Sequence, residues 1–302
     1  MDLIAAEGIE KRFGQLTALR DISLRVRRGE LYGLIGPDGA GKTTFFRILT
    51  TLMPPDGGRA TVDGLDIATD YRRIRAAVGY MPGRFSLYPD LTVKENLEFF
   101  ATLFGTRLED NYDLIRDIYV QIEPFRSRRA GRLSGGMKQK LALCCALIHR
   151  PRVLFLDEPT TGVDVVSRHE FWDMLSGLKR QGITMLVSTP YMDEAVRCDR
   201  IALIQSGRLL SIDTPQGIIE NYPDALFEVR AENMRQLTDE IRKRCSPQSC
   251  FAFGRSLHVS FSRDDAEAPH RMRVALTAAG CANLEIAPIT PGIEDCFIQQ
   301  MR

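Results

Sequence analysis

The chain has 302 residues, of which 44% are hydrophobic and 26% are charged. This length and balance predict a globular protein with one large domain and a smaller one. Lys and Arg total 40 against 39 Asp and Glu, a net charge of +1. Such a charge gives no electrostatic reason to expect nucleic acid as the main partner, so we predict none.

No apolar run in the sequence predicts a membrane-spanning helix, and the N-terminal segment does not predict a secretory signal. The longest clean apolar run, residues 141–148, is far shorter than the ~18–20 residues that a spanning helix needs. The first residues, MDLIAAEGIEKRF, lack the basic start and long apolar stretch of a secretory signal. The seven cysteines form no C-x-x-C pair and are interpreted as reduced thiols. The expected compartment is therefore the cytoplasm.

The first motif follows an apolar stretch at 31–35 and reads GPDGAGKTT at 36–44. The pattern G-x-x-x-x-G-K-[ST] predicts a loop whose backbone N–H groups surround phosphate oxygens at the positive end of the next helix. Lys42 would add its charge near the β- and γ-phosphates, and the Thr43 hydroxyl would bind Mg²⁺. A structural glycine turn would not require Lys-Thr at this place. The predicted nucleotide ligands are Gly36, Pro37, Asp38, Gly39, Ala40, Gly41, Lys42, Thr43 and Thr44.

A second apolar strand pattern, VLFL at 153–156, ends in Asp157 and Glu158. An Asp at the carboxyl end of such a strand is placed to hold the Mg²⁺ of a bound nucleotide, and an adjacent Glu can polarise an attacking water. Alone, this pair is equally compatible with a solvated turn. Together with the phosphate loop, it predicts Asp157 as a metal ligand and Glu158 as the catalytic residue.

Between the two motifs lies LSGGMKQK at 133–140. Ser134 has the residue type of a helix N-cap, and Gly135 and Gly136 leave backbone amides open, so this helix start is a second candidate anion site. The segment resembles the signature of ATP-binding cassette (ABC) transporter ATPases, and the motifs follow one another in that family's order.

The resemblance implies a fold, a mode of assembly and partners. The fold is α/β, a P-loop NTPase nucleotide-binding domain over residues 1–222, with a helical subdomain at about 86–150. In the family, two such domains pack head to tail, and each ATP lies between the phosphate loop of one and the signature of the other. Ser134, Gly135 and Gly136 would then contact the γ-phosphate bound by a second ATP-binding domain. Phe13, the alternative being a core Phe, matches the aromatic residue that stacks on adenine.

Two positions depart from the family pattern. Gly83 stands where the family has a Gln that touches Mg²⁺ and the lytic water, and Pro190 stands where it has a His that contacts the γ-phosphate. Proline has neither a side-chain donor nor a backbone N–H. Losing one preorganised donor costs about 10²–10³-fold in rate. Two hypotheses follow: slow hydrolysis at this chain's own site, or an asymmetric heterodimer in which the chain completes a partner's site.

The helical subdomain corresponds to the part that docks on a permease in the family. Thr92-Val-Lys-Glu95 is a capping-box pattern, and we expect most of the apolar stripe that follows to be core. The stripe comprises Leu97, Phe99, Phe100, Leu103 and Phe104. Phe85 and Tyr88 are the better candidates for contact with a membrane partner.

Residues 223–302 predict a small accessory domain of β-α-β-β-α-β order, a ferredoxin-like pattern. Its last strand is expected at 283–286. The segment 291–298 resembles the tail of the ABC subfamily that exports drugs and polysaccharides through separate permease subunits, with Gly292 and Cys296 departing from it. The resemblance therefore implies an ATPase that associates peripherally with the inner membrane through multi-helix permease subunits. A soluble ABC ATPase acting on ribosomes or DNA and a nucleotide sensor without turnover remain open.

Overall fold

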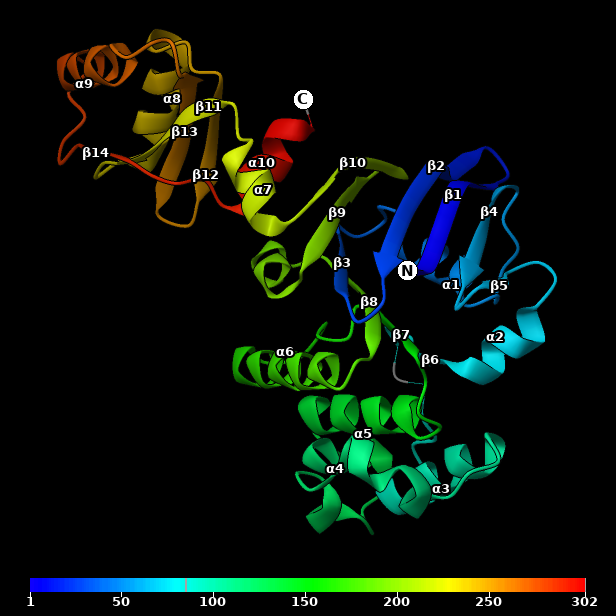
Figure 1. The fold of residues 1–302 in the computed structure, drawn as a ribbon. Helices are drawn as coiled ribbons and strands as arrows, with labels where there is room; N and C mark the ends of the chain where they lie inside the picture. Colours follow the sequence, from blue (N-terminus) through cyan, green and yellow to red (C-terminus); the bar gives the residue numbers. More distant parts are fainter. Residues whose placement is uncertain (85, 302) are drawn as a thin grey trace. The chain divides into compact units, whose positions relative to one another are not determined.

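The computed structural model describes residues 1–84 and 86–301, and within them the chain divides into two compact units, Met1–Pro215 and Gln216–Arg302 (Figure 1). The expected boundary lay a few residues later, after position 222. Phe85, one of the two aromatic candidates for a partner contact, lies outside the described residues.

The first unit is built on a mostly parallel sheet of order β10-β9-β3-β8-β7-β6. Three central strands are buried along their whole length: β3 (Leu31–Ile35), β7 (Val153–Asp157) and β8 (Thr184–Thr189). Continuous apolar runs of this kind are typical of strands that are covered on both faces. The flanking strands are β6 (Val78–Met81), β9 (Arg200–Gln205) and the antiparallel β10 (Arg208–Asp213). The carboxyl ends of the five parallel strands, all but β10, meet at one edge, which is where parallel sheets place ligands.

A second, antiparallel sheet of order β2-β1-β4-β5 packs into the same core. Its strands are β1 (Asp2–Phe13), β2 (Leu16–Arg27), β4 (Gly57–Val62) and β5 (Leu65–Asp66). The helical elements around these two sheets are α1 (Lys42–Leu49), α2 (Tyr71–Ala77), α6 (Val165–Arg180) and the 3₁₀ helix η4 (Met192–Arg197). The structure thus has the α/β class that the sequence predicts.

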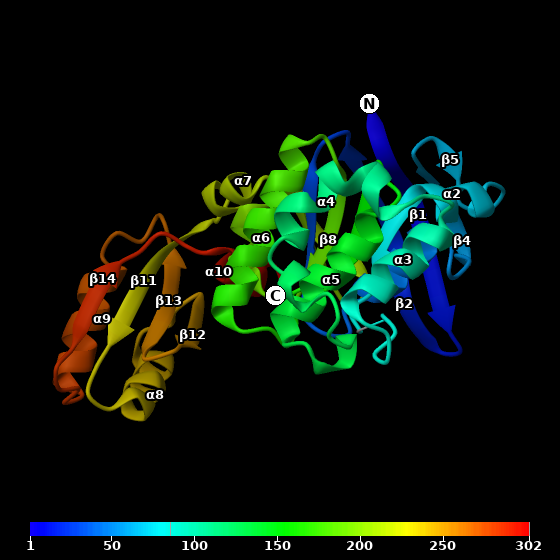
Figure 2. The same ribbon diagram turned by 90° about the horizontal axis from the view of Figure 1, so that it is seen from below.

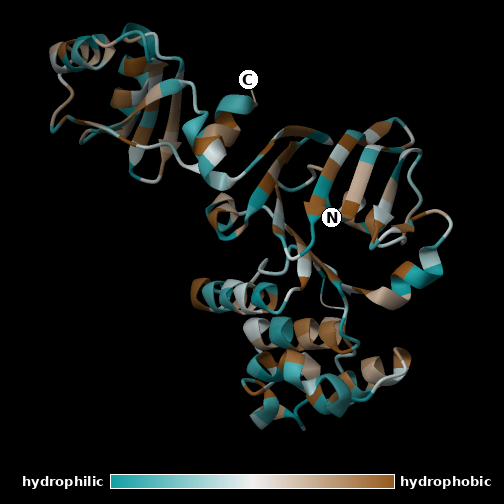
Figure 3. Ribbon diagram, in the orientation of Figure 1, coloured by the Kyte–Doolittle hydropathy of each residue, from teal (hydrophilic) through white to brown (hydrophobic). Residues whose placement is uncertain are grey.

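The helical subdomain comprises α3 (Val93–Leu103), η1 (Leu108–Asn111), α4 (Tyr112–Tyr119), η2 (Glu123–Phe125), η3 (Ala130–Arg132) and α5 (Gly135–Leu147). Helix α5 lies beside α6 in both ribbon views (Figures 1 and 2). Thr92 and Glu95 form the predicted capping box at the start of α3. Helices α4 and α6 carry both hydrophobic and hydrophilic residues, as expected of helices that bury one side (Figure 3).

The expectation that the apolar stripe of α3 is mostly core is wrong. Leu97 is fully buried, but the Phe99 side chain is 39% exposed and Leu103 is 63% exposed. The helix is amphipathic, yet its buried side is provided by Val93, Leu97 and Ala101. Helical periodicity identifies apolar positions, but it does not say which of them the rest of the protein covers. Phe99 and Leu103 lie beside the buried side of α3 and are left exposed.

The second unit has the order predicted for a ferredoxin-like domain. Its elements are α7 (Pro215–Glu220), β11 (Asp224–Arg230), α8 (Met234–Arg244), β12 (Ser249–Phe253), β13 (Ser256–Ser262), α9 (Ala268–Ala278), β14 (Glu285–Pro288) and α10 (Ile293–Gln300). The sheet order is β12-β13-β11-β14, all antiparallel. Side chains of α8 and α9 share one core with β11 and β13.

One strand of this unit begins later than expected. Asn283 has a positive φ of 54°, a left-handed conformation that Asn tolerates better than most residues because its short side chain bonds locally. The chain therefore turns at Asn283, and β14 begins at Glu285.

Candidate functional site

The glycine-rich loop joins β3 to α1 at the edge of the central sheet. The Gly36 amide donates to the Thr189 carbonyl at 3.2 Å, and a Cβ at Gly36 would lie 2.1 Å from the Ile204 carbonyl oxygen. Gly41 has a φ of 106° and would bring a Cβ within 2.6 Å of the Ala18 carbonyl. Both positions therefore require glycine.

Lys42, the first residue of α1, is only 3% exposed. Its ammonium donates to the carbonyls of Gly36 and Pro37, at 2.7 and 2.9 Å, and lies 3.0 Å from a Glu158 carboxylate oxygen. The Lys42 ammonium thus bonds back to the first two residues of its own loop. Its charge faces the end of β7, where the second motif begins.

Asp157 ends β7 and is 1% exposed. The Ser188 hydroxyl, on the neighbouring strand β8, donates to Asp157 Oδ1 at 2.7 Å. Burial raises the pKa of the Asp157 carboxyl, and hydrogen bonds from the Ser188 and Thr43 hydroxyls partly offset that rise. Thr43 and Asp157 therefore present oxygen atoms to one another, the donor set that Mg²⁺ prefers.

Glu158 follows with a backbone φ of 50°, which is uncommon for a residue with a side chain. Its amide lies within hydrogen-bond distance of both the Ser188 carbonyl, at 3.1 Å, and the Ser188 hydroxyl, at 3.0 Å. Gly83 lies directly opposite: a Cβ there would be 3.0 Å from the Asp157 carbonyl oxygen and 3.7 Å from Glu158 Cβ. The position expected to hold a Gln therefore borders the backbone of Asp157 and the base of the Glu158 side chain, and it offers no side chain.

A cleft of about 400 Å³ opens in front of these groups, within the size range of small-molecule sites. Phe13, at 46% exposure, forms part of its wall. Ser206 and Gly207, neither of which the motifs predict, also line it. The predicted residues on the wall are Phe13, Gly39, Gly41, Lys42, Thr43, Thr44 and Glu158.

The predicted residues Ser134, Gly135 and Gly136 are not part of this wall in the described chain. Ser134 caps α5, its hydroxyl accepting from the Met137 amide at 3.4 Å. A Cβ at Gly136 would lie 2.7 Å from the Ser167 hydroxyl of α6. The signature helix thus begins against α6 and away from the chain's own phosphate loop.

Pro190 directly follows β8. Ser188, two residues earlier, belongs to none of the sequence motifs, although the parallel register pairs it with Asp157. Only the order of the strands in the sheet could have identified this serine, because its partner lies 31 positions away along the chain.

A parallel sheet that ends in a phosphate-type loop, a buried Asp and a lysine-paired Glu defines a P-loop nucleotide-binding cassette. Residues 19–161 match the family model described as ABC transporter. The chain is also 37% identical over 98% of its length to the probable multidrug ABC transporter ATP-binding protein YbhF of Escherichia coli (strain K12). The chain belongs to the ABC transporter family, as one of its ATP-binding cassettes.

Other relatives differ in how much of their length is matched. The Nod factor export ATP-binding protein I of Rhizobium sp. (strain N33) is 35% identical, over 97% of this chain and 94% of the relative. The daunorubicin resistance ATP-binding protein DrrA2 of Streptomyces coeruleorubidus is 42% identical, over 71% of this chain and 68% of the relative. The chain spans about half, 51%, of the length of YbhF.

Solved structures agree with this fold. An ATP-binding subunit of an ABC transporter superposes with a TM-score of 0.66 at 27% identity, over 73% of this chain and 93% of that one. The dimeric bacterial ABC transporter cassette MJ0796 gives a TM-score of 0.63 at 25% identity, over 70% and 98%. Among the described residues, no helix combines the length and the apolar character that a bilayer crossing requires.

Proposed function

We propose that the chain is the ATP-binding and ATP-hydrolysing subunit of an export system, and that it drives transport through separate permease subunits. One observation carries this proposal: Lys42, Thr43 and Glu158 converge on a single cleft at the end of the sheet, with Asp157 buried behind them. A structural glycine turn has no need of that convergence.

In this proposal the chain's own residues bind and orient ATP. The backbone of 36–44 and the Lys42 ammonium hold the phosphates, while Phe13 stacks on the adenine. Glu158 accepts hydrogen bonds from a water aligned with the γ-phosphate. Thr43 and Asp157 would hold Mg²⁺, which stabilises negative charge on the phosphate oxygens when it is bound.

The proposed ATP site is composite and needs a second domain. Ser134, Gly135 and Gly136 lie outside the wall of this chain's cleft, among the residues described, so their amides are available to another subunit's γ-phosphate. We therefore propose a head-to-tail pair of cassettes; the structure of MJ0796, a dimer, supports pairing.

The permease contact is proposed for the exposed apolar side of the helical subdomain. Tyr88 is 46% exposed and packs edge-on against Phe99 at 4.7 Å, and Leu103 adjoins them along α3. The fully buried Asn96 fixes the backbone of Tyr88, because its side-chain amide bonds both the N–H and the carbonyl of that residue. Exposed aromatic clusters on a rigid support are typical of protein contacts. Binding there would hold the chain peripherally on the cytoplasmic side of the inner membrane.

Export rather than import is proposed from two observations. The relatives are named for multidrug transport, Nod factor export and daunorubicin resistance. The segment from 291 to 298 resembles the tail of exporter subunits, and most of it forms α10.

Turnover is proposed to be slow. Gly83 borders Asp157 and Glu158 without a side chain, and Pro190 has no donor to offer. The same two positions favour a second candidate, an asymmetric heterodimer in which this chain binds ATP and lends its signature to a better-equipped partner.

The test is the ATPase rate of the purified chain as a function of its concentration, with Glu158→Gln as the control. A rate that rises faster than linearly and disappears in the control supports a self-pairing ATPase. ATP binding without turnover supports the heterodimer, and the absence of ATP binding contradicts the proposal altogether.

A further inference from the structure

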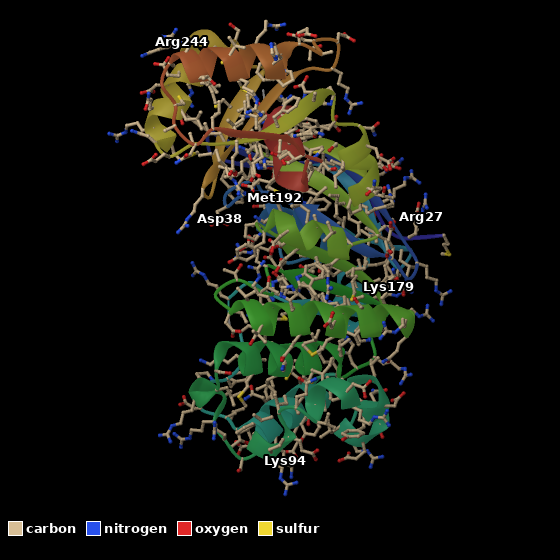
Figure 4. All side chains as sticks on the ribbon, turned by 90° about the vertical axis from the view of Figure 1, so that its left-hand side faces the viewer. Arg27, Asp38, Lys94, Lys179, Met192 and Arg244 are labelled. Carbon is tan, nitrogen blue, oxygen red and sulfur yellow. The ribbon has the colours of Figure 1, made fainter. Side chains whose placement is uncertain are left out.

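Glu194 in η4 carries a buried carboxylate to which none of the sequence motifs gives a role. It is 4% exposed and accepts hydrogen bonds from the hydroxyls of Thr160, at 2.9 Å, and Thr189, at 2.5 Å. The Arg168 guanidinium lies 3.0 Å from its Oε1. Figure 4 labels Met192, the first residue of η4. A buried carboxylate is costly unless it is paired and hydrogen-bonded, and here both conditions are met.

The donors come from three separate parts of the nucleotide site. Thr160 stands two residues after Glu158. Thr189 directly precedes Pro190, and its carbonyl accepts from the Gly36 amide at the start of the phosphate loop. One carboxylate therefore joins the segment after Glu158, the turn at Pro190 and, through Arg168, helix α6.

Arg168 strengthens the third connection. It lies in α6, one turn after Asp164, whose carboxylate caps that helix through Ser167. Its guanidinium also lies 3.9 Å from the centroid of the Tyr191 ring, in the turn that follows Pro190. The same arginine thus contacts both Glu194 and the residue next to the proline.

We propose that Glu194 is a positioning residue for ATP turnover, holding Glu158 and the Pro190 turn at a fixed spacing at the carboxyl ends of β7 and β8. Within the described chain it does not line the nucleotide cleft, so it acts through its hydrogen-bonded partners. Pro190 has no side-chain donor and no backbone N–H with which to bind a phosphate. A bound nucleotide therefore does not fix this turn through Pro190, and the position of the turn depends on contacts within the protein. The role rests on the hydrolysis proposed above.

The first test measures kcat and the ATP dissociation constant of Glu194→Gln and Thr160→Val. Thr160→Val removes one hydroxyl at nearly constant side-chain volume and leaves the Thr189 and Arg168 contacts to the Glu194 carboxylate in place, so it is the milder of the two variants. Misplacement of catalytic groups by less than an ångström costs up to about 10²-fold in rate. We expect kcat to fall about 10-fold in each variant, with the ATP dissociation constant changed less than about 2-fold.

The matched control is Asp173→Asn. Asp173 of α6 forms an ion pair with Arg197 of η4, so it joins the same two elements but touches neither Glu158 nor the Pro190 turn. It should leave kcat and ATP affinity unchanged. Equal loss of rate in this control, or parallel loss of affinity and rate in Thr160→Val, would overturn the proposal and indicate a general packing effect.

The second test does not depend on hydrolysis. The Glu158 amide bonds to Ser188 and the Tyr191 amide bonds to the Thr189 hydroxyl at 3.1 Å, so hydrogen exchange at both amides reports on the two segments. In Glu194→Gln and Thr160→Val both should exchange faster, while α1 amides stay unchanged. A wild-type chain without turnover would contradict the ATPase proposal but leave this measurement decisive. Unchanged exchange at both amides would refute the role of Glu194.

Discussion

The two walls of the nucleotide cleft are built in opposite ways. On one wall, Gly39, Gly41 and Lys42 line the cleft with main-chain groups and a buried charge. The other wall is the end of β7 and β8 around Glu158, where Gly83 and Pro190 present no side-chain donor and the polar groups centred on Glu194 are buried. If the proposed function holds, this difference means that holding ATP and cleaving it depend on separate parts of this chain. Substitutions should therefore separate affinity from rate.

The largest effect is expected for Lys42→Ala, which removes the buried charge from the first wall. A charge-assisted contact to phosphate contributes about 1.5–3 kcal/mol, so ATP affinity should fall on the order of 10²-fold. Fluorescent-nucleotide titration of the monomer measures it. Lys140→Ala is the matched control, because Lys140 pairs with Glu170 on α5 and α6 at a comparably shielded site. Undiminished affinity in Lys42→Ala would contradict the assignment of the phosphate loop.

The next effect concerns the second wall. Pro190→His supplies a donor at the end of β8, and we expect the ATPase rate to rise about 10-fold with ATP affinity unchanged, part of the 10²–10³-fold that one preorganised donor provides. Pro190→Ala is the control, since it removes the ring and restores the backbone N–H but adds no side-chain donor. An equal gain in both variants would mean that the backbone at this position, rather than the imidazole, limits the rate.

Acid sensitivity reports on the helical subdomain, where His149 follows α5 and stacks on Phe104. Burial lowers the pKa of His149 to about 4, so the folded protein keeps this side chain neutral while the unfolded chain protonates it below about pH 6.5. Stability is thus lost as the pH falls from about 6.5 toward 4. Allowing for partial solvent exposure, the loss between pH 7 and 5 is about 1 kcal/mol.

His149→Phe, which keeps the stacked contact that Phe104 makes at 3.8 Å, should reduce this loss in urea unfolding experiments across that pH range. The exposed His270, changed to Asn, should leave the pH dependence as in the wild type. Equal pH dependence in His149→Phe and the wild type would contradict the buried neutral state of His149.

The smallest effect is expected for Gly83→Gln. The added Cβ would lie 3.0 Å from the Asp157 carbonyl oxygen, so the loop must shift by a few tenths of an ångström before the amide can reach the water. We expect a gain of only about 2- to 3-fold in the ATPase rate. Combined with Pro190→His, a gain far above the product of the two single gains would show that the two positions act as one unit.

The phosphate loop was predictable because its geometry is local. The spacing of glycines and Lys42 within one short segment dictates both the loop and its chemistry. The order of elements in the second unit was predictable for a related reason, since period-2 and period-3.6 patterns alternate along 224–300.

The network around Glu194 was not predictable in this way. Its donors stand at positions 160, 168 and 189, and nothing in any one segment indicates that they meet. The exposure of Phe99 likewise depends on what covers α3, which helical periodicity does not specify.

The left-handed backbone at Glu158 has a consequence for protein engineering. A design procedure that scored only backbone strain would place glycine or asparagine at position 158, because few residues with a side chain accept a φ of 50°. The redesigned chain would relieve a local strain and lose the carboxylate that we propose orients the attacking water. Thermostability screens of such cassettes should therefore leave position 158 unchanged. The residue with the least backbone strain there is not the residue that carries the carboxylate.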